Sequence, residues 1–454
     1  MKNKILSMLL VTAMVATMLV GCGDSKNTDT DTKTETETET ETDKEDKDAE
    51  PSTEAVTLKT VSMFAGTDPN AEAYQEISKQ FQKEYDYITL EDNSQTSDQD
   101  WKQSIAADFA VGNEPDVIQF FTDATANTVL ATDKFVTLKD IQAEYPDYAK
   151  DITDVALKAT ANPDGVNRAV PTTGYWEGLF CNKDLFDQYK VALPTDWATF
   201  TTAIETFKKN GIIPIACSLN NVPHYWLEYC MLYTAGLDEY QSVPATAPES
   251  WIKGLETIKT LRDMGAFPED TDTVDDAYAG ELFKTKKAAM QLDGSWYAGG
   301  VVEAGNAETT VVVPFPGVEN QKAEANTIIS GMSSGFYITK KAWDDPAKRD
   351  AAVKYVMANT SKEGIQKYWE STGKIQVTAA ELEAPEGLST LGKSALELVN
   401  AATATALPTD ARLGTDPYSV LTTNVAKISV GSVTAKDIIN EALALYKELN
   451  PDAE

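Results

Sequence analysis

Residues 87–121 read YITLEDNSQTSDQDWKQSIAADFAVGNEPDVIQFF, and this stretch decides the fold class. Its first four residues are β-branched, aromatic or aliphatic, which is typical of a strand. Residues 100–111 have an amphipathic helical pattern and are followed by Gly112, a residue type that commonly ends helices. Residues 115–121 form a second apolar run, as expected of a buried strand. A strand, a helix and a strand in succession predict an α/β fold with a parallel sheet.

The same alternation continues on both sides of this stretch. Residues 56–64 predict a strand, and residues 71–85 predict a helix with one apolar face. Further strands are predicted at 178–181, 212–217, 287–292, 310–314 and 335–338. Further helices are predicted from residue 184 onward and over 197–210, 225–235, 249–264 and 348–357, and the region 388–449 is nearly all helical. The roughly 400 residues involved are enough for two domains with sizeable cores.

The first 22 residues have the pattern of an export signal. Lys2 and Lys4 precede the largely apolar residues 5–20, which predicts a secretory signal peptide over residues 1–21. The apolar run is shorter than the roughly 20 residues that span a bilayer. Residues 19–22, Leu-Val-Gly-Cys, resemble the lipobox of bacterial lipoproteins, whose cysteine carries a diacylglycerol. The resemblance implies lipid attachment at Cys22 and a location at the extracytoplasmic face of the cell membrane. The alternative is an ordinary cleaved signal with a chance cysteine.

A polar segment follows, and we expect it to be a disordered tether over residues 22–55. Residues 23–55 contain 13 Asp or Glu and 4 Lys, a net charge of −9, and no aromatic residue. Such a segment buries too little apolar surface to offset the entropy lost on ordering. It would hold the folded part away from the membrane.

The whole chain is strongly acidic, with a formal net charge of −32. A field of this sign repels phosphate backbones, so we expect no nucleic-acid binding. It also favours an uncharged or cationic ligand over an anionic one.

The remaining cysteines and the single histidine exclude several kinds of site. Cys181, Cys217 and Cys230 are three in number, so a full disulfide framework is excluded; either Cys217 and Cys230 form one bridge, or all three are small buried residues. His224 is the only histidine, so no zinc cluster is expected and a catalytic triad has one possible base. The acidic loop 270–276 lacks the glycine and the final glutamate of a calcium loop. The sequence therefore predicts no metal and no cofactor.

Three stretches together resemble the extracellular solute-binding protein family 1 of ABC importers, which includes the maltose- and oligosaccharide-binding proteins. The first is YWEGLFCNKDLF at 175–186, followed by PTDW at 194–197 and GIIPI at 211–215. The second runs from Phe283 through AAMQLDGSW at 288–296. The third is GMSSGFYI at 331–338. The resemblance covers essentially all of residues 56–450.

The resemblance implies a periplasmic-binding-protein-like fold of type II, with two discontinuous α/β lobes joined by a hinge and a ligand cleft between them. By analogy, the first lobe takes residues 56–167 and 326–368, and the second takes 168–325 and 369–454. The implied function is that of a lipid-anchored receptor that binds a mono- or oligosaccharide and delivers it to the membrane permease of an ABC transporter. A monomer without enzymatic activity is expected.

Carbohydrate recognition needs flat aromatic rings for the C–H faces of a sugar and strong acceptors for its hydroxyl groups. A cleft lined by aromatic side chains and carboxylates is therefore expected. By position in the family's contact segments, the resemblance implies ligand-binding roles for Asp68, Phe120, Asp123, Trp176, Glu177, Tyr225, Trp226, Trp296, Tyr418 and Arg412. Each has a structural alternative, because rings often pack in cores and acids are often merely solvated. Trp101, Trp197, Trp251 and Trp343 are expected to pack on helix faces.

Two other functions remain open from the residues alone. A surface glycoside hydrolase would need two carboxylates about 5 to 10 Å apart across a cleft, and the 71 acidic residues do not exclude such a pair. A peptide-binding or adhesion lipoprotein would have a cleft with fewer stacked aromatic rings.

Overall fold

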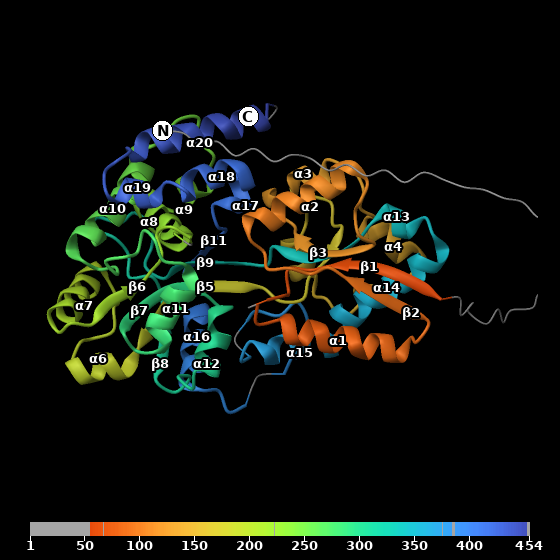
Figure 1. Cartoon of the computed structure of the whole chain (residues 1–454), viewed down its shortest axis with the longest axis horizontal. Helices are drawn as coiled ribbons and strands as arrows, with labels where there is room; N and C mark the ends of the chain where they lie inside the picture. Colours follow the sequence, from red (N-terminus) through yellow and green to blue (C-terminus); the bar gives the residue numbers. More distant parts are fainter. Residues whose placement is uncertain (1–54, 67, 222, 375, 384–385, 452–454) are drawn as a thin grey trace, which may run out of the picture. The chain divides into compact units, whose positions relative to one another are not determined.

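The computed structural model describes residues 55–66, 68–221, 223–374, 376–383 and 386–451, all of which belong to one compact unit of the chain, residues 53–454 (Figure 1). The predicted signal peptide, the lipid-attachment residue Cys22 and the tether up to its last residue lie outside the described residues. Within the described ranges, no helix is both long enough and apolar enough to cross a membrane.

The first of two sheets is built around the predicted strand–helix–strand stretch. Its order is β2 (Ile88–Asp92), β1 (Val56–Val61), β3 (Val117–Phe121), β10 (Ser334–Ile338) and β4 (Ala169–Val170). β1 pairs in parallel with β2 and β3, as predicted, whereas β10 is antiparallel to both of its neighbours. Figure 1 shows α1 (Ala71–Glu84) and α15 (Lys362–Ser371) on one side of this sheet, and α2 (Gln99–Val111) and α3 (Asn127–Leu130) on the other.

The second sheet has the order β11 (Ala404–Ala406), β9 (Thr327–Gly331), β5 (Tyr175–Asn182), β7 (Ala288–Gly294) and β6 (Ile213–Ala216), with β8 (Thr310–Val313) also pairing with β5. β5 is antiparallel to β7, β8 and β9, while β6 is parallel to β7. The expectation of a parallel sheet is therefore wrong for both sheets as wholes. The reason is that β5 and β10 enter their sheets directly from the other sheet, without the crossover helix that makes neighbouring strands parallel.

The remaining helices, in chain order, are η1 (Ala124–Ala126), α4 (Leu138–Glu144), α5 (Asp154–Ala159), α6 (Lys183–Tyr189), α7 (Trp197–Lys209), α8 (His224–Ala235), α9 (Leu237–Gln241), α10 (Glu249–Met264), α11 (Asp276–Lys284), α12 (Tyr297–Glu303), α13 (Lys340–Trp343), α14 (Pro346–Thr360), α16 (Thr390–Asn400), α17 (Asp410–Leu413), α18 (Thr415–Thr422), α19 (Val425–Ser429) and α20 (Ala435–Leu449). The predicted helices are all present, within a few residues at their ends. α2 begins after Asp98, whose carboxylate accepts a hydrogen bond from Trp101 N, and it ends at Gly112 as predicted.

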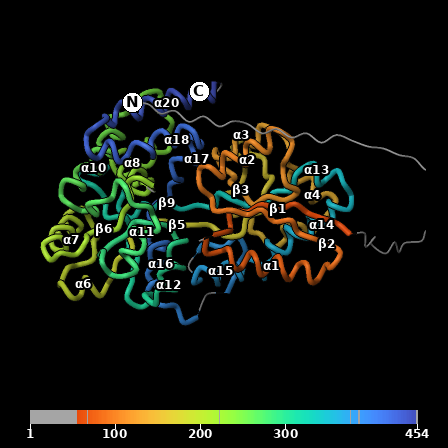
Figure 2. The backbone as a smooth tube through the Cα atoms, viewed as in Figure 1, coloured from red at the N-terminus to blue at the C-terminus, as the bar shows by residue number. Residues whose placement is uncertain are grey.

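Within the described part of the chain, the strand and helix contacts place three passages between the two sheets, and the tube of Figure 2 shows the two groups of elements that they join. The first is residues 171–174, between β4 and β5, and the second is residues 332–333, between β9 and β10. The third passage lies between the end of α15, which packs on α1, and the start of α16, which packs on β8. The lobe boundaries predicted from the sequence remain a proposal, and the strand pairing favours crossings slightly later than residues 168, 326 and 369.

Each sheet has its own hydrophobic core. The core of the second sheet contains the inner side of β5 and β7 together with α7, α8 and α10, and the core of the first contains β1, β10, α1 and α14. Trp101 and Trp251 are buried on helices, as expected. Cys181, Cys217 and Cys230 are all buried and free, so the alternative without a disulfide is the correct one.

α8 and α10 pack with their backbones close together, and a substitution at this contact tests the packing of the two helices. A Cβ atom at Gly254 would lie 2.8 Å from both Cα and N of Met231. Gly254→Ala should therefore lower the free energy of unfolding by about 1 to 3 kcal/mol, because the helices must separate. Gly300→Ala is the matched control, since its Cβ would meet nothing closer than 3.8 Å and alanine favours a helix. Urea unfolding followed by circular dichroism checks both, and equal stability of the two variants would contradict the contact.

Candidate functional site

Two half-buried aromatic rings, Tyr175 and Trp296, lie next to each other where the chain enters and leaves the second sheet. Their centroids are 5.8 Å apart, with an interplanar angle of 48°. Each ring lies over a glycine of a strand: a Cβ at Gly294 would come within 2.3 Å of the Trp296 ring, and one at Gly331 within 3.3 Å of the Tyr175 hydroxyl. The strands thus leave space for two flat rings at this edge.

A hydrogen-bonded chain fixes the Trp296 ring. Trp296 Nε1 donates to the hydroxyl of Tyr225 over 3.1 Å, and that hydroxyl donates to Asp293 Oδ1 over 2.9 Å. Gln291 Nε2 donates to the other oxygen of Asp293 over 2.7 Å. Tyr225 stands in the first turn of α8, where the ring of His224 lies 3.9 Å from its own. The indole is therefore oriented by residues of α8 and β7 together.

Five carboxyl groups gather around these rings: Asp123, Glu177, Glu228, Asp293 and Asp410. Glu177 lies two residues from Tyr175 on β5, so both side chains face the same side of the strand. Glu228 lies one turn along α8 from Tyr225, and its Oε1 accepts a hydrogen bond from Thr409 N over 3.1 Å. The cluster thus joins elements that are far apart in the sequence.

Burial strongly changes the acidity of this cluster. Burial, and then the charges of neighbouring carboxylates, raise the pKa of Glu177 well above its usual range. Burial and then Asp410 raise the pKa of Glu228 to about 8 and that of Asp123 to about 6. Burial and then Asp276 raise the pKa of Asp293 to about 7. Burial lowers the pKa of His224 to about 4, so this imidazole is neutral at pH 7.

The site draws side chains from both lobes. Asp123 follows β3 and accepts a hydrogen bond from Thr125 N over 2.9 Å, and the helix that it begins packs against α17. Lys102 on α2 pairs with Asp410 at the start of α17, with 3.6 Å between Nζ and Oδ2. Lys102 is 11 % exposed and Asp410 is 16 % exposed, so this ion pair is largely shielded from water. It directly links the first lobe to the second.

Asp123, Glu177, Tyr225 and Trp296 are the predicted residues that the structure brings together. Tyr418 is buried beside Glu228. Arg412 lies behind the cluster: its guanidinium is 4.2 Å from the centroid of the Tyr240 ring, and its Nη1 donates to the Ser242 carbonyl over 3.0 Å. Tyr418 and Arg412 therefore support Glu228 from the protein side.

Three predicted aromatic residues pack in cores instead, and we leave them out of the site. Trp226 is 1 % exposed and its ring packs among those of Phe200, Phe267 and Phe315. Trp176 is fully buried and stacks on Phe180, on the opposite side of β5 from Glu177.

Phe120 is 1 % exposed and packs against Trp101 at 5.4 Å. All three rings have both faces turned toward protein, so as placed they offer no surface to a ligand.

Asp68 lies apart from the carboxyl cluster. Its Oδ1 accepts a hydrogen bond from Asn70 N over 2.8 Å, and burial raises its pKa to about 6. The adjacent Pro69 comes close to α12, since a Cβ at Gly299 would be 3.2 Å from it. Asp68 therefore stands at a second point where the lobes approach each other, near Tyr368.

The sequence reading missed five members of the site: Lys102, Tyr175, Glu228, Asp293 and Asp410. Two of these residues have a feature in the amino-acid sequence that could have identified them. Glu228 is the single acid in a largely apolar helix. Tyr175 would face the same side of the strand as Glu177 if the strand predicted at 178–181 began at residue 175.

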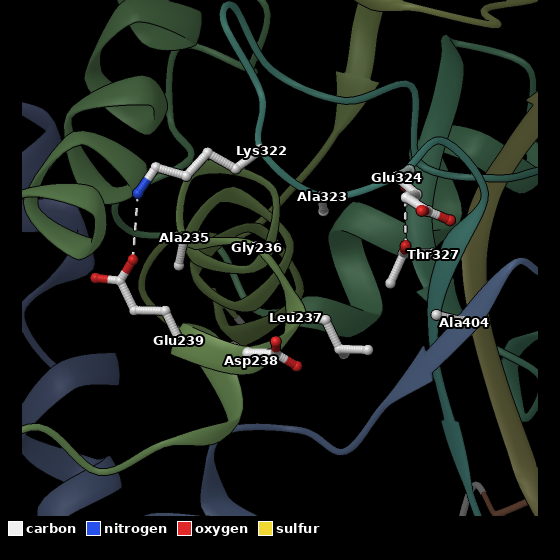
Figure 3. A pocket seen from close by; sticks show the side chains of 10 residues that line it. All are labelled: Ala235, Gly236, Leu237, Asp238, Glu239, Lys322, Ala323, Glu324, Thr327 and Ala404. Carbon is white, nitrogen blue, oxygen red and sulfur yellow. Dashed lines mark hydrogen bonds and ion pairs between the residues drawn. The ribbon is translucent and has the colours of Figure 1, made fainter.

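A separate surface pocket lies at the other end of α8 (Figure 3). It has a volume of about 490 Å³ and is lined by residues 235–239, residues 322–324, Thr327 and Ala404. Lys322 and Glu239 form an ion pair of 3.2 Å at its edge. None of the predicted site residues lines it. Within the described part of the chain, no group of three or more His, Cys, Asp or Glu side chains is placed to hold a metal ion.

A comparison with known protein families shows to which family the chain belongs. A family model described as bacterial extracellular solute-binding protein matches residues 76–389. The chain belongs to this family. The resemblance to extracellular solute-binding proteins and the predicted α/β fold class are thereby confirmed. A search among curated proteins found no match.

Solved structures with the same fold include sugar-binding proteins of low sequence identity. A chitin oligosaccharide binding protein is 21 % identical with a TM-score of 0.77, and the match covers 87 % of this chain and 99 % of the other. A sugar transporter of Bacillus licheniformis in complex with stachyose is 18 % identical with a TM-score of 0.67, covering 87 % and 100 %. The Thermus thermophilus maltotriose binding protein is 16 % identical with a TM-score of 0.67, covering 86 % and 99 %.

These similarities show that the solute-binding protein has the fold of sugar- and oligosaccharide-binding proteins. Members of this family are solute-binding receptors, in agreement with the prediction of a non-enzymatic protein.

The raised pKa values of the buried carboxyls predict how stability depends on pH. Because the folded-state pKa values of Glu228 and Asp293, about 8 and about 7, exceed the unfolded values near 4, the folded state binds more protons between these limits. Stability should therefore be highest at acidic pH and fall as the pH rises from about 5 to about 8. We expect the Tm to fall by several degrees over this range.

Glu228→Gln removes one titrating group while keeping an oxygen for Thr409 N, so it should flatten this decline. The exposed Glu205→Gln is the control and should leave the slope unchanged. Differential scanning calorimetry at a series of pH values measures both. A wild-type Tm that rises with pH would show that these carboxyls are ionised in the folded protein.

Proposed function

We propose that this solute-binding protein is a lipid-anchored receptor that binds a mono- or oligosaccharide between its two lobes and delivers it to the permease of an ABC importer. The observation that carries the proposal is the Trp296–Tyr225–Asp293 chain. It holds an indole ring at a fixed angle, half-buried beside a second ring and a group of carboxyls.

This arrangement suits a sugar for physical reasons. The C–H face of a pyranose packs on a flat, rigid ring, and Trp296 and Tyr175 provide two at an angle to each other. Carboxyl groups are strong hydrogen-bond acceptors for hydroxyls, and a protonated carboxyl can also donate. The sugar-binding proteins of similar fold, whose names specify chitin oligosaccharide, stachyose and maltotriose, support the same ligand class.

A ligand in this site would contact both lobes and favour their closed arrangement. A ligand shifts a conformational equilibrium only by its differential affinity for the two states. Asp123 belongs to the first lobe and Glu177 to the second, so a sugar that bonds to both gains contacts only when the lobes are together. The ion pair between Lys102 and Asp410 also joins the two lobes.

The membrane location rests on the sequence. Attachment of lipid to Cys22 and the tether over residues 22–55 would keep the receptor near its permease. We expect a monomer, with the closed form docking on the permease subunits.

A ligand screen tests the class of solute. Thermal-shift measurements on the full chain with sugars, peptides and inorganic ions should show that sugars raise the Tm. If peptides raise it and no sugar does, the protein is a peptide-binding receptor and the carbohydrate proposal is wrong.

Removing the indole tests the site. Trp296→Ala should weaken binding of the sugar found in the screen by about 1 to 3 kcal/mol, because one stacking partner is lost. Tyr225→Phe should weaken it less, since the ring remains but loses its anchor. Trp343→Ala on α13 is the matched control: it removes an indole from the first lobe and should leave affinity unchanged. Titration calorimetry measures all three, and an unchanged affinity of a folded Trp296→Ala protein removes this residue from the site.

A further inference from the structure

The two lobes touch beside the site where η1 of the first lobe packs against α17 of the second. η1 has the sequence Ala-Thr-Ala, and Gly414 follows α17 directly. A Cβ atom at Gly414 would lie 3.5 Å from the carbonyl oxygen of Ala124. Such small residues bury little apolar surface, so their packing attracts the lobes only weakly.

Lys102 and Asp410 form an ion pair across this contact. Lys102 lies on α2 of the first lobe, and its Nζ is 3.6 Å from Oδ2 of Asp410 in the first turn of α17. The same Nζ is 4.5 Å from the centroid of the Phe121 ring at the end of β3, a distance at which an aromatic ring attracts a cation. Phe121 in turn packs against the buried Phe120, with 5.5 Å between the ring centroids. The first lobe thus positions the ammonium group that pairs with α17.

The burial of this pair decides how much it contributes. Exposed ion pairs contribute little, because water solvates both charges. Lys102 is 11 % exposed and Asp410 is 16 % exposed, so water hardly reaches this one. Where water is excluded, removal of one partner leaves the other as an unpaired buried charge, which is costly. Separation of the lobes would let water reach both groups, so the pair matters only while the lobes are together.

The surroundings of Asp410 make it depend more strongly on Lys102. After burial, the charge of Asp410 is the largest factor that raises the pKa values of Asp123 and Glu228. Lys102 acts in the opposite direction on Asp123 and lowers its pKa. Asp410 therefore stands among other acids, and Lys102 brings a positive charge to it from the other lobe.

We propose that Lys102 and Asp410 form a latch that holds the lobes together and sets the rate at which a bound solute leaves. They are positioning residues, which act on the lobes and make no contact with the solute. This inference rests on the proposed function, because it requires a solute that binds between the lobes. The solute enters while the lobes are apart and leaves after the pair breaks. The latch therefore slows dissociation and leaves association nearly unchanged.

A double-mutant cycle tests whether the two side chains act as a pair. Stopped-flow fluorescence of the full chain measures the association and dissociation rates of the sugar found in the screen. Lys102→Met and Asp410→Asn should each speed dissociation roughly tenfold and change association by less than about threefold. The double variant should release the sugar no faster than either single variant, because the second substitution removes a group that has already lost its partner.

Two further variants serve as controls for charge and for position. Lys102→Arg keeps the cation and should keep the slow dissociation. Lys134→Met removes a lysine that pairs with Glu114 over 2.8 Å within the first lobe, and it should leave the rates unchanged.

Small-angle X-ray scattering without a sugar tests the latch directly. The radius of gyration of Lys102→Met should exceed those of the wild type and of Lys134→Met, because the lobes separate more often. The segment before residue 55 is the same in every variant, so it does not affect this comparison.

The outcomes separate the latch from the function on which it rests. If the effects of the two single variants on dissociation multiply in the double variant, the side chains act independently and the latch is wrong. The latch is also wrong if Lys102→Met speeds dissociation with no change in the radius of gyration, since Lys102 would then contact the sugar itself. If no sugar binds, the carbohydrate function fails, and the scattering comparison still decides whether the pair holds the lobes together.

Discussion

The site depends on the way that β5 lies in the second sheet. β5 is antiparallel to β7, β8 and β9, so its hydrogen bonds fix it along its whole length. Its first residues directly follow the segment that comes from the first sheet. Tyr175 and Glu177 therefore lie where the two lobes approach each other. The backbone of Glu177 is held further by Tyr229, whose hydroxyl donates to its carbonyl over 2.8 Å. The sheet and α8 therefore fix the backbone position from which the Glu177 side chain extends.

This constraint explains why the interface between the lobes is electrostatically unfavourable on its own. In this structure Asp123 is buried beside Asp410, and Glu177 is buried near Glu228 and Asp410. One ion pair, Lys102 with Asp410, offsets part of this cost, and proton uptake offsets more. Buried charges that lack partners destabilise a structure far more than exposed ones. A ligand that supplies donors thus stabilises the closed form by more than its own contacts, which is the behaviour that a receptor sensing occupancy requires.

Much of the fold was predictable from the sequence, and part of the site was not. Strands and helices followed from apolar runs and from the period of amphipathic helices, as for β3 and α2. The direction of β5 was not predictable, because an apolar strand has the same pattern whether its neighbours are parallel or antiparallel. The same physical reason applies to Trp176, which is buried on the opposite face of β5 from Glu177, since a strand buried on both faces gives no sign of which side chains face the site. It applies also to Trp226: α8 is apolar on all sides, so its sequence does not show which side its rings face.

The acids were the hardest residues to select, because 71 of them are spread along the chain and most are solvated. Glu228 and Asp293 differ from the others only in their surroundings, which arise from contacts between distant segments. The net charge of the whole chain nevertheless has the same sign as the carboxyl groups of the buried cluster. The electric field of a net charge of −32 extends into the solvent, but salt largely screens it beyond about 8 Å at physiological ionic strength. The buried cluster is shielded from salt, so the interactions among its carboxyl groups persist where those between surface charges are screened. The pKa values of Glu228 and Asp293 therefore depend on burial in the fold rather than on the net charge of the chain.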